Sequence, residues 1–163
     1  MKPIILISGE DGFDHRSGSP HFVLSRNYPK AVSQAGGMPV LATSYKTIAE
    51  YVELADGLLL THGPIIHPAR YGQIAVTHDD IRGFSDTRDD LDFSLCYEFL
   101  KEGKPVMAIG RGSRVLNITI DKHFSDKRGG LKCLGIGFTK TMFENAIPEF
   151  NVFVDMCKEV GKQ

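Results

Sequence analysis

Four apolar runs of strand length, separated by stretches with helical periodicity, constrain the fold of this 163-residue chain more than any other feature. Two of these runs lack polar alternation, which is typical of strands covered by helices on both faces. Strands that alternate with helices form repeated βαβ units and a parallel sheet. We therefore expect an α/β fold, a three-layer α/β/α sandwich. The predicted strands are Ile4–Ile7, Met38–Leu41, Gly57–Leu60 and Val106–Ile109.

Helical patterns connect these runs and predict a mainly parallel, flavodoxin-like sheet. The predicted helices cover residues 25–35, 47–54, 88–102, 111–118 and 148–160. Glycines follow several of them and Pro148 opens the last, as helix boundaries require. In the third helix an apolar stripe predicts plain core: Leu91, Leu95, Phe99 and Leu100. The last helix carries a second apolar face, which we expect to dock on the sheet or on a second subunit: Phe150, Phe153, Val154 and Cys157. Residues 131–138 fit either a strand or a loop.

Length and composition indicate one domain over residues 1–163, with a core that needs no disulfide or metal. A net charge of −1 gives no electrostatic case for nucleic acid, so we expect small-molecule or protein partners. No apolar run approaches the roughly 18 residues of a membrane span, and the first residues are too short for a signal peptide. These features predict a cytoplasmic protein without a membrane partner. Cys96, Cys133 and Cys157 lack metal-ligand spacing and predict buried free thiols.

The segment from Pro105 to Gly112 predicts a strand, a sharp turn and a helix start, with glycine at the tip of the turn. In a nucleophile elbow, a Ser or Cys is lifted above a parallel sheet beside helix N-terminal amides that can hold an oxyanion. Gly110 keeps such a turn without any side chain, because glycine adopts positive φ with no Cβ penalty. The sequence thus predicts an enzyme-like scaffold that lacks a nucleophile.

Several short motifs follow one another along residues 2–120. They are Tyr28 before Ala31-Val32, the run Ala35 to Val40, Ala55 to Thr61, Pro68 with Tyr71-Gly72, Asp86 to Asp89, Gly103 to Val106, Gly110 to Gly112, and Val115 to Asn117. This collinear set resembles the class I glutamine amidotransferase superfamily. The resemblance is closest to its γ-glutamyl-γ-aminobutyrate hydrolase branch, the C26 type of cysteine peptidase.

The resemblance implies a catalytic Cys where this chain has Gly110, and oxyanion-hole amides at Gly63 and Arg111. It also implies a catalytic His, with Glu two residues later, near the C-terminus. After Ile120 the sequence contains only His123, so we expect the rest of the triad and one or more strands to be missing. No catalytic residue is expected to be intact, and no cofactor is implied. The residues expected to contact a ligand are His62, Tyr71, Arg88 and Arg114.

Two groups of polar residues leave alternatives open. Arg111 and Arg114 could bind an anion with free helix amides, or Arg111 could be buried against a carboxylate. Six aspartates crowd residues 78–92 and predict a solvated loop and helix start, where Arg88 and Asp89 could shape a pocket: Asp79, Asp80, Asp86, Asp89, Asp90 and Asp92. Histidines on loops match no ligand motif, so no metal site is expected: His15, His62, His67 and His78.

These observations predict a catalytically impaired member of the superfamily that keeps a cleft for a small γ-glutamyl or amino-acid-like ligand, or serves as an interaction module. The alternative is an active amidohydrolase on γ-glutamyl amides, of the glutamine or γ-glutamyl-polyamine type, that uses displaced groups such as Cys133. A third hypothesis is a structural subunit of a homo-oligomer, a dimer in which helix 148–160 covers the edge of a shortened sheet.

Overall fold

The computed structural model describes residues 1–74, 84–137 and 146–160. Its centre is a five-stranded sheet of order β4-β1-β5-β6-β7, in which every neighbouring pair is parallel. The four predicted strands are confirmed to within one residue, and the ambiguous segment 131–138 contains the fifth. Their bounds are β1 Ile4–Ser8, β4 Met38–Ala42, β5 Gly57–Leu60, β6 Val106–Ile109 and β7 Cys133–Ile136.

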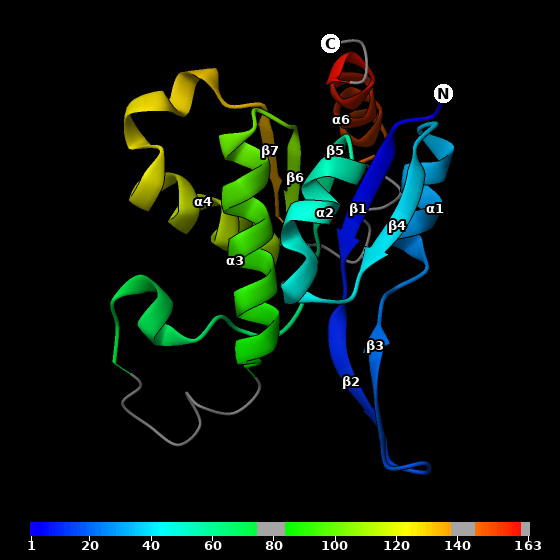
Figure 1. The fold of residues 1–163 in the computed structure, drawn as a ribbon, viewed down its shortest axis with the longest axis vertical. Helices are drawn as coiled ribbons and strands as arrows, with labels where there is room; N and C mark the ends of the chain where they lie inside the picture. The colour runs from blue at the N-terminus through cyan, green and yellow to red at the C-terminus, as the bar shows by residue number, and fades with distance from the viewer. Residues whose placement is uncertain (75–83, 138–145, 161–163) are drawn as a thin grey trace.

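Helices cover both faces of this sheet and give the expected three-layer sandwich (Figure 1). On one face lie α1 Asn27–Gln34 and α6 Ile147–Val160. On the other lie α2 Ile48–Leu54, α3 Asp86–Lys101 and α4 Arg111–His123. The described residues also form three short 3-10 helices: η1 Tyr45–Thr47, η2 Pro68–Tyr71 and η3 Ser125–Gly130.

The core is divided by the sheet, because successive strand side chains point to opposite faces. Leu58 and Leu60 of β5 pack toward α3 and α4, whereas Leu59 between them packs toward α1 and α6. The apolar face of α6 is fully buried in this second layer: Phe150, Phe153, Val154 and Cys157. Of the two expected positions for the last helix, the structure has the one in which it docks on its own sheet.

An antiparallel hairpin formed by β2 Glu10–Asp14 and β3 Ser19–Val23 was not expected from the sequence. It projects beyond the carboxyl ends of the sheet strands, at the bottom of Figure 1. Every residue of β3 is exposed, so the hairpin has no buried face and no apolar alternation by which the sequence could signal it. Its position next to the strand ends gives it a place in the site described below.

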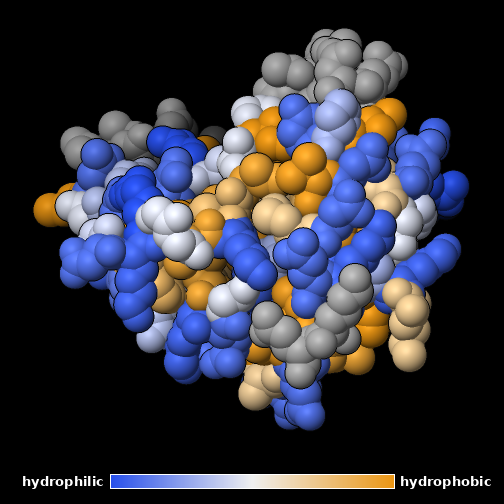
Figure 2. All heavy atoms as spheres, turned by 90° about the horizontal axis from the view of Figure 1, so that it is seen from above, coloured by the Kyte–Doolittle hydropathy of each residue, from blue (hydrophilic) through white to orange (hydrophobic). Residues whose placement is uncertain are grey.

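The opposite end of the molecule holds the N-terminus and the end of α6 (Figure 1). Figure 2 shows this end with hydrophobic atoms in hollows between hydrophilic side chains. One hollow is lined by the first residues of the chain together with Asp56, Cys157 and Lys158. Within the three described ranges, no helix combines the length and the apolar character needed to cross a bilayer.

Candidate functional site

The predicted turn between β6 and α4 is present, and Gly110 is its tip. Gly110 has φ 57° and ψ −110°, a conformation that a residue with a Cβ adopts only under strain. Its N–H donates to the Ile136 carbonyl of β7 at 2.9 Å, which fixes the turn against the neighbouring strand. The next glycine, Gly112, lets α4 approach β5, since a Cβ there would lie 2.6 Å from the Leu60 carbonyl oxygen. The backbone therefore has the form of a nucleophile elbow without the nucleophile.

The register of the sheet brings three strand ends into a row beside this turn. Ile7 pairs with Leu59, so Glu10 and His62 follow at equivalent places beyond β1 and β5. Leu60 pairs with Ala108, so His62 in turn lies level with Gly110. The chain leaves β1 toward β4 on one side and returns to β5 on the other, which makes the β1–β5 junction the topological switch point. Open α/β sheets bind their ligands at such a junction.

Arg88 of α3 fills the inner part of the switch point. Its Nη2 donates to Thr61 Oγ1 at 2.8 Å and to Ser8 Oγ at 3.2 Å, and its Nη1 donates to the Gly9 carbonyl. Its Nε contacts Asp92 Oδ2 at 2.8 Å. Arg88 is only 2% exposed, so all of its guanidinium nitrogens are used inside the protein. Arg88 thus holds the loops after β1 and β5 together, and its contact with a ligand stays a prediction from the sequence.

Arg111 at the start of α4 joins the same group of charges. Its guanidinium donates to Asp92 Oδ2 and to Asp89 Oδ1, and all three side chains are buried. Asp89 also accepts the His67 N–H at 2.9 Å, which attaches the loop after β5. We call Arg88, Asp89, Asp92 and Arg111 the arginine–aspartate cluster. Of the two alternatives for the Arg111 side chain, the structure has the one in which it is buried against carboxylates.

The arginine–aspartate cluster also corrects the view of the aspartates as a solvated helix start. Asp89 and Asp92 are both 0% exposed, whereas Asp90 points outward and pairs with Arg70. Asp79 and Asp80 lie outside the described residues. Two guanidinium and two carboxylate groups balance one another in the cluster, as buried charges require. Asp92 Oδ1 and Arg111 Nε are nevertheless buried with no hydrogen-bond partner among the described residues.

The remaining predicted site residues are spread over this edge. Gly63 follows His62, and a Cβ placed on Gly63 would first meet the carboxylate of Glu10 from the hairpin. The His62 N–H donates to the hydroxyl of Tyr28 at 3.0 Å, and burial raises the pKa of Tyr28. Tyr71 is exposed at the end of η2, and Arg114 is exposed one turn after Arg111 on α4. Glu10 and Tyr28 were not predicted as site residues; the register of β1 and β5 places Glu10, and the hydrogen bond with His62 places Tyr28.

The cysteines lie away from the elbow. Burial raises the pKa of Cys96 and of Cys157 to about 12, and it also raises the pKa of the half-buried Cys133. Cys133 pairs with Val106 at the start of β6, four residues before Gly110. At roughly 3.3 Å per residue, this places the two positions about 13 Å apart along the sheet. Among the described residues, no group of three His, Cys, Asp or Glu side chains could hold a metal ion, and His78 lies outside these residues.

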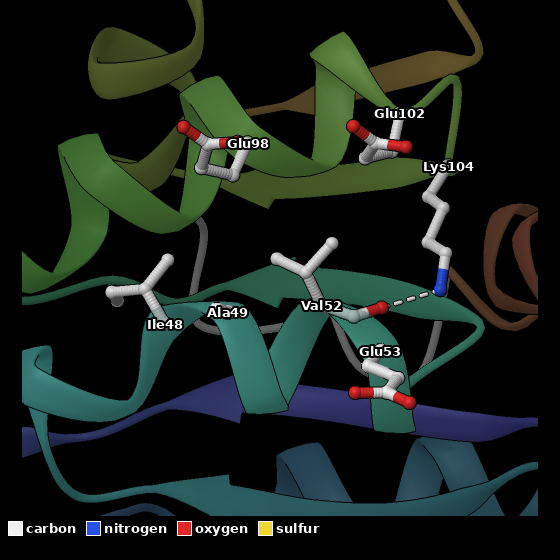
Figure 3. A pocket seen from close by; sticks show the side chains of 7 residues that line it. All are labelled: Ile48, Ala49, Val52, Glu53, Glu98, Glu102 and Lys104. Atoms are coloured by element: carbon white, nitrogen blue, oxygen red, sulfur yellow. Dashed lines mark hydrogen bonds between the residues drawn. The ribbon is translucent and has the colours of Figure 1, made fainter.

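A surface hollow lies away from the elbow, in the groove between α2 and α3 (Figure 3). Its volume is about 680 Å³, with Ile48, Ala49 and Val52 on one wall and Glu98 and Glu102 on the other. Lys104 reaches across one end of the groove and donates to the carbonyls of Val52 and Ala55, which ties the end of α2 to the segment before β6.

The Peptidase C26 family model matches residues 3–124, well over half of the chain. This chain belongs to the peptidase C26 family. It is 31% identical over 125 residues to the protein NtpR of Enterococcus hirae, covering 74% of this chain and 52% of that protein. It is 33% identical over 113 residues to a glutamine amidotransferase-like protein of Rickettsia prowazekii, covering 66% of this chain and 40% of that protein. The chain thus spans about half or less of the length of these curated relatives.

The matched region runs from β1 to the end of α4 and contains Glu10, Gly63, Gly110 and the arginine–aspartate cluster. The resemblance to class I glutamine amidotransferases is therefore confirmed at the level of the family. A solved structure of a hydroxyethylthiazole kinase protein from Pyrococcus horikoshii aligns with a TM-score of 0.46 at 13% identity, covering 98% of this chain and 52% of that one. A likeness this low bears on neither fold nor function.

Proposed function

We propose that this member of the peptidase C26 family binds a small γ-glutamyl or amino-acid-like ligand at the row of strand ends without hydrolysing it through a thiol. The observation that carries the proposal is Gly110, which holds the elbow conformation at φ 57° and ψ −110° but has no side chain. Thiol-dependent amide hydrolysis needs a thiolate as the attacking atom, and only the elbow places that atom beside the α4 amides.

The electrostatics of the described cysteines support the same proposal. A thiol with a pKa of about 12 is almost entirely protonated at neutral pH, so Cys96 and Cys157 are poor nucleophiles. The remaining cysteine, Cys133, would have to move by about the length of a strand to reach the elbow. The alternative function, hydrolysis of γ-glutamyl amides through Cys133, therefore has little geometric support.

The binding half of the proposal rests on the preserved backbone. The α4 N-terminus and the loop after β5 remain in place because the arginine–aspartate cluster connects them. A helix N-terminus favours carboxylate and carbonyl oxygens, which γ-glutamyl compounds carry at both ends. A ligand of this class therefore suits the site even when the reactive thiol is gone. The predicted cytoplasmic location and homo-oligomer stay predictions from the sequence.

Calorimetric titration with glutamine, glutamate and a γ-glutamyl amide tests this proposal, with release of glutamate and ammonia measured in the same samples. We expect binding without product. Turnover by the unaltered protein would contradict the proposed loss of thiol catalysis, and loss of that turnover in Cys133→Ser would establish the alternative. Failure of all three compounds to bind would contradict the ligand-binding role and favour an interaction module.

The Gly110→Cys variant is the matched control for the elbow. Its new thiol lies beside helix amides, which lower a thiol pKa, so it should react with iodoacetamide faster than the buried Cys96 and Cys157. Rapid labelling at position 110 of this variant, with unchanged ligand binding, would support an elbow that is accessible and lacks only its nucleophile. If labelling of the unaltered protein at its own cysteines were equally fast, the proposal of an unreactive chain would fail.

A further inference from the structure

A half-buried carboxylate, that of Glu10, lies over Gly63 in the row of strand ends. A Cβ placed on Gly63 would be 3.2 Å from Glu10 Oε1 and 3.4 Å from Glu10 Cγ. No donor or cation among the described residues forms a hydrogen bond or ion pair with this carboxylate. Glu10 thus differs from the other acidic groups at this edge, since Asp89 and Asp92 are both paired.

The charges around Glu10 do not compensate it. Arg88 donates to the carbonyl of the neighbouring Gly9, but its charge is already matched within the arginine–aspartate cluster. Glu10 is therefore an additional negative charge beside a neutral cluster. A carboxylate partly removed from water and left without a counter-charge is costly, and a cation that enters the site recovers this cost.

We infer that Glu10 makes this edge of the sheet a receptor for a primary ammonium group, so that the ligand presents an amine beside Gly63. This inference rests on the proposed function, in that it assumes a small ligand at the same edge. In the family, Gly63 corresponds to an amide that holds an oxyanion. A carboxylate within contact distance of Gly63 repels negative charge there and attracts positive charge instead.

The glycine at position 63 fits this role. Any side chain there would crowd Glu10, because 3.2 Å is tighter than an ordinary carbon–oxygen contact. The absence of a Cβ gives the Glu10 carboxylate room to lie against Gly63, and the hairpin supplies the carboxylate from β2. The carboxyl ends of β1 and β5 and the start of the hairpin thus combine into one subsite that no single motif in the sequence encodes.

Two ligands with the same carbon chain test the inference. Glutamate carries the ammonium group and glutarate lacks it, so their affinities for the unaltered protein isolate its contribution. We expect glutamate to bind at least about tenfold more tightly, the loss of one charge-assisted contact being of that order. Glu10→Gln should remove the difference, and Glu10→Asp should keep part of it. Glu53→Gln, an equal charge change on the distant α2, should leave the difference intact.

The outcomes separate this inference from the proposed function. Equal binding of glutamate and glutarate, or a difference that survives in a folded Glu10→Gln protein, overturns the ammonium subsite and leaves the proposed function standing. If butylamine binds in a Glu10-dependent manner while glutamate, glutamine and the γ-glutamyl amide do not, the subsite stands and the γ-glutamyl ligand class is wrong. Failure of all these compounds to bind, butylamine included, overturns both.

Discussion

The elbow and the arginine–aspartate cluster lie at the same edge of the sheet, and they differ in what they retain. The elbow has its backbone geometry at Gly110 but no reactive side chain. The cluster has four charged side chains, all buried, whose contacts join α3, α4 and the loops after β1 and β5. The positioning of the site and its chemistry are therefore carried by different residues. Loss of the nucleophile removes a single thiol group. Loss of the cluster would remove the contacts that hold α3, α4 and the loops after β1 and β5 together.

The largest effect is expected from removal of a shared cluster carboxylate. Asp92→Ala eliminates the partner of both Arg88 and Arg111 and leaves two buried cations with one counter-charge. Breaking a buried ion pair in this way lowers the free energy of unfolding by about 3–5 kcal/mol. Urea denaturation followed by circular dichroism measures this change.

The matched control is Asp90→Ala, two residues earlier on the same helix. Asp90 is half-exposed and pairs with Arg70, so its loss should cost less than about 1 kcal/mol. If Asp92→Ala and Asp90→Ala had the same stability, the cluster would not hold the edge and the contrast with the elbow would fail. An Asp92→Ala protein that does not fold at all agrees with the prediction.

Gly112→Ala should have the second largest effect. Alanine favours helices by about 1 kcal/mol over glycine, but here its Cβ would lie 2.6 Å from the backbone oxygen of Leu60. Because the obstacle is a strand backbone, α4 must move away from β5, and overpacking of this kind costs about 1–3 kcal/mol. The cost of overpacking exceeds the gain in helix propensity, so thermal denaturation should show a lower melting temperature. Gly129→Ala, where a Cβ meets nothing within 4 Å, should not lower it.

Gly110→Ala tests whether the backbone is strained at the tip of the elbow. The strained backbone conformation destabilises a residue with a Cβ by roughly 1–3 kcal/mol. Alanine also lowers the entropy of the unfolded chain, which stabilises the folded protein by about 0.4–1 kcal/mol. We expect a net loss of about 1 kcal/mol in urea denaturation, with Gly130→Ala as the unstrained control. A stabilised Gly110→Ala protein would show that the elbow stores no strain, and the likeness to a nucleophile elbow would then be in doubt.

The sequence predicts the sheet of this protein well, because its strands are apolar runs between helices. Residues 57–60 and 106–109 were found with both ends correct. The hairpin escaped prediction because β3, with Pro20 and His21, has no buried face. Its contribution to the site, Glu10, was missed for the same reason.

The burial of Asp89 and Asp92 was also missed, although the sequence holds a signal for it. Asp92 is spaced three and seven residues before Leu95 and Phe99, which places it on the buried face of α3. The position of Asp92 in the helical repeat thus predicts burial, although aspartate is usually exposed. What the sequence lacked was the partner: only the fold brings Arg111, nineteen residues later, against the same carboxylate.

The smallest effect is expected at Ser113, where the elbow helix contacts two strands. Its hydroxyl lies 2.8 Å from the Ala108 carbonyl and 2.9 Å from the Ile136 carbonyl, so it joins the ends of β6 and β7. A hydroxyl has one proton and can donate to only one of these oxygens at a time. Ser113→Ala should therefore cost one hydrogen bond, about 1 kcal/mol, as urea denaturation would measure.

Ser94→Ala, at an exposed position of α3, should be neutral or slightly stabilising, since alanine is the better helix former. A loss at Ser113 as large as that of Asp92→Ala would mean that the elbow, and not the arginine–aspartate cluster, holds this edge of the sheet together.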